Sequence, residues 1–115
     1  MGVVTGQQPG GAVHAARPGR AARVIGDLAE LRGPVRGAVE LPVRLFWAPD
    51  RTFDLDDPVE LRWMYENVLR EAIRGDELRR WLDGNTLVRL WPTLNLPRGV
   101  RRAWESRHAQ LRRAT

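Results

Sequence analysis

The strongest pattern of apolar and polar positions lies in residues 58–74 and has the period of an α-helix. One side of this helix would carry most of its apolar residues: Leu61, Met64, Tyr65, Val68, Leu69, Ala72 and Ile73. Asp57 is a typical N-cap, Pro58 suits the first helical position, and Glu60 is placed as in a capping box. Gly75 is a typical C-terminal stop. The pattern therefore predicts an amphipathic helix that buries one face.

Two apolar residues of this helix fall on its polar side. Val59 and Trp63 lie opposite the apolar stripe, in the company of Arg70. Tryptophan and arginine are the residue types most enriched at binding hot spots, so Val59, Trp63 and Arg70 form a candidate protein-contact patch. Burial of Trp63 under residues 38–47 explains the same pattern equally well, and the sequence leaves both explanations open.

Residues 38–47 alternate between apolar and polar positions, which predicts an extended or strand-like segment. One side would carry Val39, Leu41, Val43, Leu45 and Trp47. Pro42 lacks an N–H group and confines such a strand to a sheet edge. Because no other clear strand is predicted, we expect this segment either to lie over the helices or to pair with another chain.

Residues 20–32 have apolar residues at helical spacing and are followed by Gly33 and Pro34, which predicts a helix that ends there. Its apolar face consists of Val24, Ile25, Leu28 and Leu31. Gly26 weakens this helix by about 1 kcal/mol relative to alanine. Residues 1–19 are rich in glycine and proline and poor in bulky apolar groups, so we expect a flexible, disordered N-terminal arm.

Two short helices are predicted within residues 76–91. Asp76 would cap the first helix, which ends at Gly84, and Asn85 or Thr86 would cap the second. A helix–turn–helix motif has this outline. However, the second helix carries a single arginine, whereas a recognition helix presents several polar groups to the bases. We therefore interpret the pair as consecutive short helices of a bundle.

The last predicted helix, residues 97–113, is amphipathic and basic. Its apolar side carries Val100, Ala103, Trp104 and Leu111. The other side carries the candidate nucleic-acid contacts Arg98, Arg101, Arg102, Arg112 and Arg113. Residues 96–115 contain six arginines and one glutamate, a net charge of +5. A solvated basic face and a docking face for an acidic protein are the alternatives.

These elements predict a mostly α fold. We expect a compact helical domain over residues 38–115, a weak helix and linker over 20–37, and the arm over 1–19. Core packing is the default expectation for four of the five tryptophans, Trp63 being the exception: Trp47, Trp81, Trp91 and Trp104.

Composition excludes several classes of site. The chain has no cysteine, so neither disulfides nor thiolate sites exist. All 19 basic residues are arginine, which suggests a GC-rich bacterial genome. No apolar stretch is long enough for a membrane span or resembles a signal peptide, so we expect no membrane association and a cytoplasmic location.

The sequence shows no catalytic signature, so we expect a non-enzymatic protein with no metal or cofactor. The acidic cluster does not have the spacing of a calcium loop, and we interpret its residues as turn and cap formers: Asp50, Asp54, Asp56 and Asp57. His108 has no evident catalytic or metal-binding partner and is expected at the edge of the last helix.

The segments "RLFW", "DLDDP" and "YENVLREA", with the pattern L-x-R-L-W-P-x-L-x-L-P-x-x-V-R-x-x-W, resemble small uncharacterised proteins of high-GC bacteria. Some of those accompany toxin–antitoxin or mobile-element genes. The resemblance favours a small regulatory or partner-binding protein, with an antitoxin-like role as one candidate. A protein partner or self-association is expected because the chain is small, lacks a catalytic signature, carries Trp63 off the apolar stripe and has a strand-like edge without a partner. The alternative hypothesis is nucleic-acid binding through the arginine face of the last helix.

Overall fold

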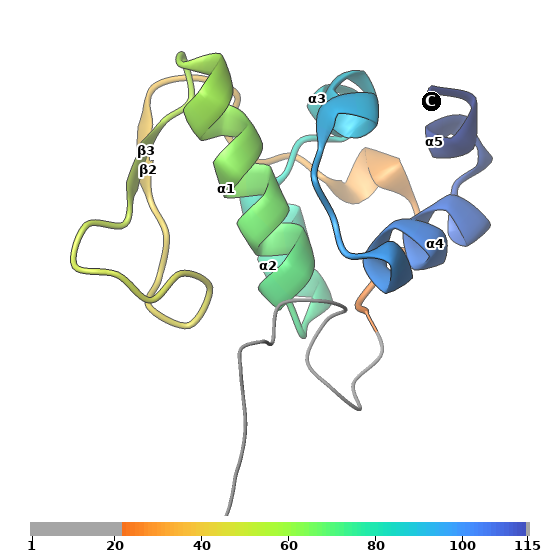
Figure 1. Cartoon of the computed structure of the whole chain (residues 1–115), viewed down its shortest axis with the longest axis horizontal. Coiled ribbons are helices and arrows are strands. Elements are labelled where there is room, and N and C mark those ends of the chain that lie inside the picture. The colour runs from red at the N-terminus through yellow and green to blue at the C-terminus, as the bar shows by residue number, and fades with distance from the viewer. Residues whose placement is uncertain (1–21, 115) are drawn as a thin grey trace, which may run out of the picture.

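The computed structural model describes residues 22–114 and confirms the mostly α class (Figure 1). The predicted arm, residues 1–19, lies outside the described residues. Along the described part the elements are η1 (Leu28–Glu30), β2 (Ala38–Glu40), β3 (Thr52–Asp54), α1 (Pro58–Glu71), α2 (Gly75–Trp81), α3 (Gly84–Leu90), η2 (Trp91–Thr93), α4 (Arg98–Arg107) and α5 (Ala109–Ala114). Figure 1 shows α1 in the middle, the two strands on one side of it, and α3, α4 and α5 on the other.

Helix α1 is built as its sequence predicts at the N-terminus. The Asp57 carboxylate accepts hydrogen bonds from the N–H groups of Val59 (2.9 Å) and Glu60 (3.4 Å). The Glu60 carboxylate does not close a capping box on Asp57. It accepts a hydrogen bond from the Asp54 N–H (2.8 Å) and so ties the helix to β3. The predicted apolar stripe is buried over most of its length: Leu61, Met64, Tyr65, Val68, Leu69 and Ala72.

The predicted end of this helix is wrong. Helix α1 ends at Glu71, and Ala72 has an extended backbone (φ −64°, ψ 136°). Gly75 is not a stop but the first residue of α2. Asp76 does not cap α2, because the buried Glu77 carboxylate accepts hydrogen bonds from the backbone just before that helix.

The expected strand finds its partner within this chain. Strand β2 pairs antiparallel with β3, with Ala38 opposite Asp54 and Glu40 opposite Thr52. The prediction that the whole of 38–47 is extended is wrong. A turn follows, in which the N–H groups of Leu45 and Phe46 donate to the Pro42 carbonyl.

The turn breaks the alternation of apolar side chains. Leu41 and Leu45 are buried in the core, whereas Val43 and Trp47 are exposed. Arg51 holds the loop closed by donating to the carbonyl oxygens of Leu41 (2.9 Å) and Ala48 (3.2 Å). The loop is thus shaped by side-chain hydrogen bonds rather than by a strand ladder.

The predicted helix at 20–32 is wrong as well. Residues 22–27 are not helical, and η1 supplies a single 3-10 turn (Leu28–Glu30). Its apolar positions are nevertheless in the core: Ile25, Leu28 and Leu31. Tertiary hydrogen bonds replace helical ones, because the Gly33 N–H donates to Leu82 O (2.7 Å) and the Gly84 N–H donates to Leu31 O (3.1 Å).

Glycine is required where this segment meets the linker between α2 and α3. A Cβ on Gly33 would lie 2.5 Å from the Trp81 carbonyl carbon, and a Cβ on Gly84 would lie 2.5 Å from Leu28 O. Backbone can approach backbone this closely only without side chains. Helix α3 is capped by Asp83, which accepts from the Thr86 N–H (3.0 Å), and not by Asn85 or Thr86.

The last predicted helix is two helices. The chain leaves helical geometry at His108 (φ −126°, ψ 97°), which separates α4 from α5. His108 is not a helix-edge residue: it is buried, and its Nε2 is hydrogen bonded to the Ile25 carbonyl (2.8 Å). Trp91 and Trp104 are fully buried with ring centroids 6.4 Å apart, which confirms that both face the core.

Candidate functional site

Most large apolar side chains of the described residues are in the core, and the exposed ones include Val35 as well as two tryptophans and two valines of α1 and of the loop after β2. Trp47 is 82% exposed and Trp63 is 56% exposed. Val43 and Val59 are 50% and 42% exposed. Exposed tryptophan is costly in water and is typical of binding surfaces. We call these four residues the tryptophan surface.

The hairpin loop and α1 contribute jointly to this surface. Val43 and Trp47 line a hollow of about 370 Å³ together with Asn67 and Glu71 of α1. Trp63 precedes Asn67 by one helical turn, so both lie on the same side of α1. The Asn67 amide donates to the Trp63 carbonyl oxygen (2.8 Å). Trp47 thus lines the hollow itself, whereas Trp63 lies on α1 one turn before Asn67 and is not part of its lining.

The predicted contact patch is placed only in part as expected. Val59 and Trp63 are exposed, and residues 38–47 leave more than half of Trp63 in solvent. Arg70 does not point freely outward, because it donates to Asn67 Oδ1 (2.7 Å) and pairs with Glu71 (3.6 Å). Trp47 was expected in the core and instead is the most exposed of these side chains.

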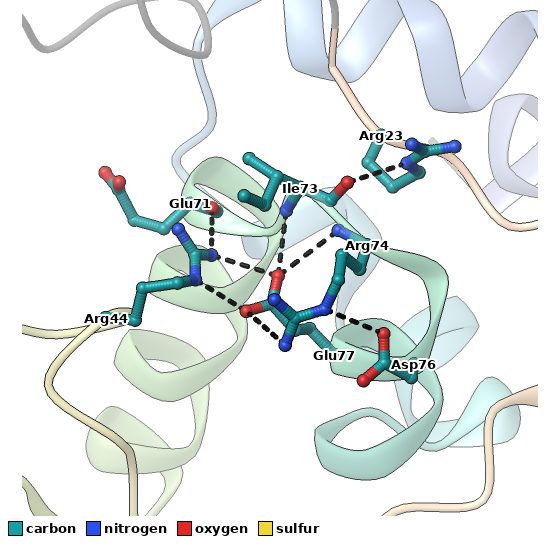
Figure 2. Close-up of polar contacts among 7 residues, drawn as sticks. All are labelled: Arg23, Arg44, Glu71, Ile73, Arg74, Asp76 and Glu77. Carbon is teal, nitrogen blue, oxygen red and sulfur yellow. Dashed lines mark hydrogen bonds and ion pairs between the residues drawn. The ribbon is translucent and has the colours of Figure 1, made fainter.

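An ion pair between the half-exposed Arg44 and the buried Glu77 fixes the loop that carries Trp47 (Figure 2). Arg44 donates from Nε (2.6 Å) and Nη2 (3.0 Å) to the Glu77 carboxylate, and from Nη2 to the Glu71 carbonyl (2.6 Å). The Glu77 side chain is 6% exposed and that of Arg44 is 35% exposed. A two-bond guanidinium–carboxylate contact fixes direction as well as distance. The loop is therefore anchored at the junction of α1 and α2.

Glu77 also accepts hydrogen bonds from the N–H groups of Ile73 (2.9 Å) and Arg74 (3.2 Å). Burial alone would raise the pKa of this carboxyl. The hydrogen bonds from Arg44 and from the two backbone N–H groups outweigh burial, so the pKa is lowered below its ordinary value. With both oxygens engaged within the protein, Glu77 serves as a structural anchor (Figure 2).

The predicted arginine face divides into two parts. Arg101 is turned inward: it donates to Leu94 O (2.6 Å) and Trp91 O (3.3 Å), and its guanidinium lies 4.9 Å from the Trp91 ring centroid. Arg98, Arg102 and Arg112 line a second hollow of about 320 Å³. The residues lining that hollow also include Arg101, Glu105 and Ser106, but not Arg113.

The acidic cluster acts as the turn and cap residues that its composition suggests. Asp50 accepts from the Thr52 N–H (3.0 Å), and Asp54 accepts from the Asp56 N–H (3.0 Å). Between residues 22 and 114, no group of three or more acidic or histidine side chains is arranged to hold a metal ion. Each helix of this part of the chain is too short or too polar to cross a membrane.

The chain matches no protein-family model, and no curated protein and no solved structure is significantly similar to it.

Proposed function

We propose that this protein is a non-enzymatic, cytoplasmic regulatory protein that binds a second protein on the tryptophan surface. The observation that carries the proposal is the exposure of Trp47 (82%), which lines a hollow together with Asn67, and of Trp63 (56%), which lies on α1 one turn before Asn67. Large aromatic side chains beside a pocket form the centres of protein interfaces. An antitoxin-like role, which the resemblance implies, would be exercised through such a contact.

The charges at the hollow indicate what the partner presents. Arg44 is paired with Glu77, and Glu71 is paired with Arg70. The charged groups of the hollow thus already have opposite charges beside them, so the hollow offers little attraction to a charged ligand. We infer that the partner inserts an apolar side chain into the hollow beside Val43 and Trp47 and covers Trp63, where burial of indole and aliphatic area supplies the affinity.

The anchored loop favours binding by a preformed surface. Because Arg44 and Arg51 hold the loop at both ends, little conformational entropy is lost when a partner covers Trp47.

The test is photo-cross-linking in native cells with a photoreactive amino acid in place of Val43. We expect one discrete cross-linked product. It should disappear in the double variant Trp47→Ser, Trp63→Ser and persist in the control Gln110→Ser, whose side chain is exposed on α5. Both tryptophans are exposed, so the double variant should fold, which circular dichroism checks.

A product that persists in the double variant would contradict the proposal, as would the absence of any product. Sedimentation equilibrium of the purified protein identifies the remaining outcome. A dimer that the double variant loses would show that the occupant is a second copy of this chain and not a different protein.

A further inference from the structure

The second hollow, between α4 and α5, concentrates positive charge. It is lined by Arg98, Arg101, Arg102 and Arg112, with Glu105 as its single carboxylate, a net charge of +3. Ser106 adds a hydroxyl group. Glu105 is engaged by Arg101 (3.5 Å) and by the Trp91 indole N–H (2.8 Å). The one negative charge is thus matched by the inward-turned arginine, and Arg98 and Arg102 line the hollow without an ion pair among residues 22–114.

The break at His108 creates this arrangement. In a continuous helix Arg112 would lie about 21 Å along the axis from Arg98. The extended backbone at His108 turns α5 back against α4, and Figure 1 shows α5 above α4. Arg112 therefore reaches the hollow that Arg98 and Arg102 line. The His108 hydrogen bond to Ile25 (2.8 Å) holds the bend in place.

Arg98 and Arg102 are exposed, and no hydrogen bond or ion pair occupies either of them among residues 22–114. Guanidinium groups donate two parallel hydrogen bonds and match the oxygen geometry of phosphate. Several guanidinium groups around one hollow can bind neighbouring phosphates at the same time. Arg107 and Arg113 are exposed but are not part of the lining of the hollow.

We propose that this hollow binds the phosphate backbone of double-stranded nucleic acid. The proposal is independent of the tryptophan surface. Trp91 and Trp104, the aromatic residues nearest to these arginines in the sequence, are buried and offer no platform on which an unpaired base could stack. Binding is therefore expected to depend on phosphates and not on base sequence.

The structure assigns the contacts unequally. Arg98, Arg102 and Arg112 would contact phosphate, whereas Arg101 holds α4 on η2 and Arg113 lies outside the hollow. Three phosphate contacts predict that affinity falls about 40-fold between 50 and 200 mM salt. Removing two of the contacts should reduce that salt effect to about fourfold.

The test is fluorescence anisotropy of the full chain with a labelled DNA duplex of arbitrary sequence, across this salt range. We expect the double variant Arg98→Gln, Arg102→Gln to lose most of the binding and most of the salt dependence. The single variants Arg113→Gln and Arg36→Gln remove the same charge from outside the hollow and should bind nearly as well as the unmodified protein.

Four results would overturn the proposal. The first is no duplex binding at 50 mM salt. The second is an equal loss in Arg113→Gln and in Arg102→Gln, which would indicate net charge alone. The third is equally effective competition by polyglutamate, a polyanion without phosphate. The fourth is saturable binding of inorganic phosphate without binding of the duplex, which would assign the hollow to a small phosphate compound.

Discussion

Replacing Glu77 by glutamine tests whether one buried carboxylate holds the α1–α2 junction and the loop of the tryptophan surface. Glutamine has nearly the same shape, but its NH₂ group must face a donor in place of an oxygen. The carboxylate accepts from Arg44 at 2.6 and 3.0 Å and from two backbone N–H groups at 2.9 and 3.2 Å. The variant therefore leaves at least one donor without an acceptor and removes the charge opposite Arg44.

The magnitude follows from burial. Breaking a fully buried ion pair costs about 3–5 kcal/mol. The Arg44 side chain is 35% exposed and can turn towards water, so we expect the lower part of that range, about 3 kcal/mol. With a urea m-value of about 1.5 kcal/mol/M, the unfolding midpoint should fall by about 2 M.

Urea unfolding followed by tryptophan fluorescence measures this change. Asp76→Asn is the matched control, because Asp76 precedes Glu77 on the same helix and also contacts Arg74 (3.1 Å) but is exposed. Its midpoint should stay close to that of the unmodified protein. Equal midpoints for the Glu77 and Asp76 variants would refute the reasoning.

A double-mutant cycle with Arg44→Met separates the ion pair from the backbone contacts. We expect a coupling energy of about 1–2 kcal/mol between positions 44 and 77. Hydrogen exchange should also become faster in residues 42–47 of the Glu77→Gln variant, since the loop loses its anchor. A coupling near zero with a large single-variant effect would assign the stabilisation to the backbone N–H groups alone.

Three further predictions concern pH, the two core tryptophans and a close backbone approach. Because the pKa of Glu77 is lowered on folding, its ionised carboxylate stabilises the folded protein fully above the ordinary value of 4.5. This stabilisation is lost as the pH falls below that value. Urea midpoints measured across this range should therefore fall less in Glu77→Gln than in the unmodified protein. Trp91→Phe should destabilise the protein by about 1–2 kcal/mol more than Trp104→Phe, because the Trp91 indole N–H donates to Glu105 whereas that of Trp104 has no partner. Equal losses of stability for the two variants in thermal unfolding would contradict this. Gly33→Ala should lower the unfolding midpoint strongly, since its Cβ would lie 2.5 Å from backbone, and an unchanged midpoint would show that the segment can move away.

Parts of the candidate site follow from the sequence. The helical period places Val59 and Trp63 on the polar side of α1, and both are exposed. The same method fails for Trp47. Its alternation with Leu41 and Leu45 predicts burial, but the turn at Pro42 ends the strand period before Trp47 is reached. Hydrogen bonds within the loop decide where this tryptophan points, and the spacing of apolar residues does not predict them.

The sequence by itself determines the features that are encoded within one or two helical turns. The N-cap at Asp57, the buried stripe of α1 and the core-facing Trp91 and Trp104 all follow from residues three or four positions apart. Tertiary structure alone decides the inward turn of Arg101, the Arg44–Glu77 pair and the break at His108. The partner of Glu77 is 33 positions away in the chain and that of His108 is 83 positions away, and local sequence patterns do not indicate such distant partners.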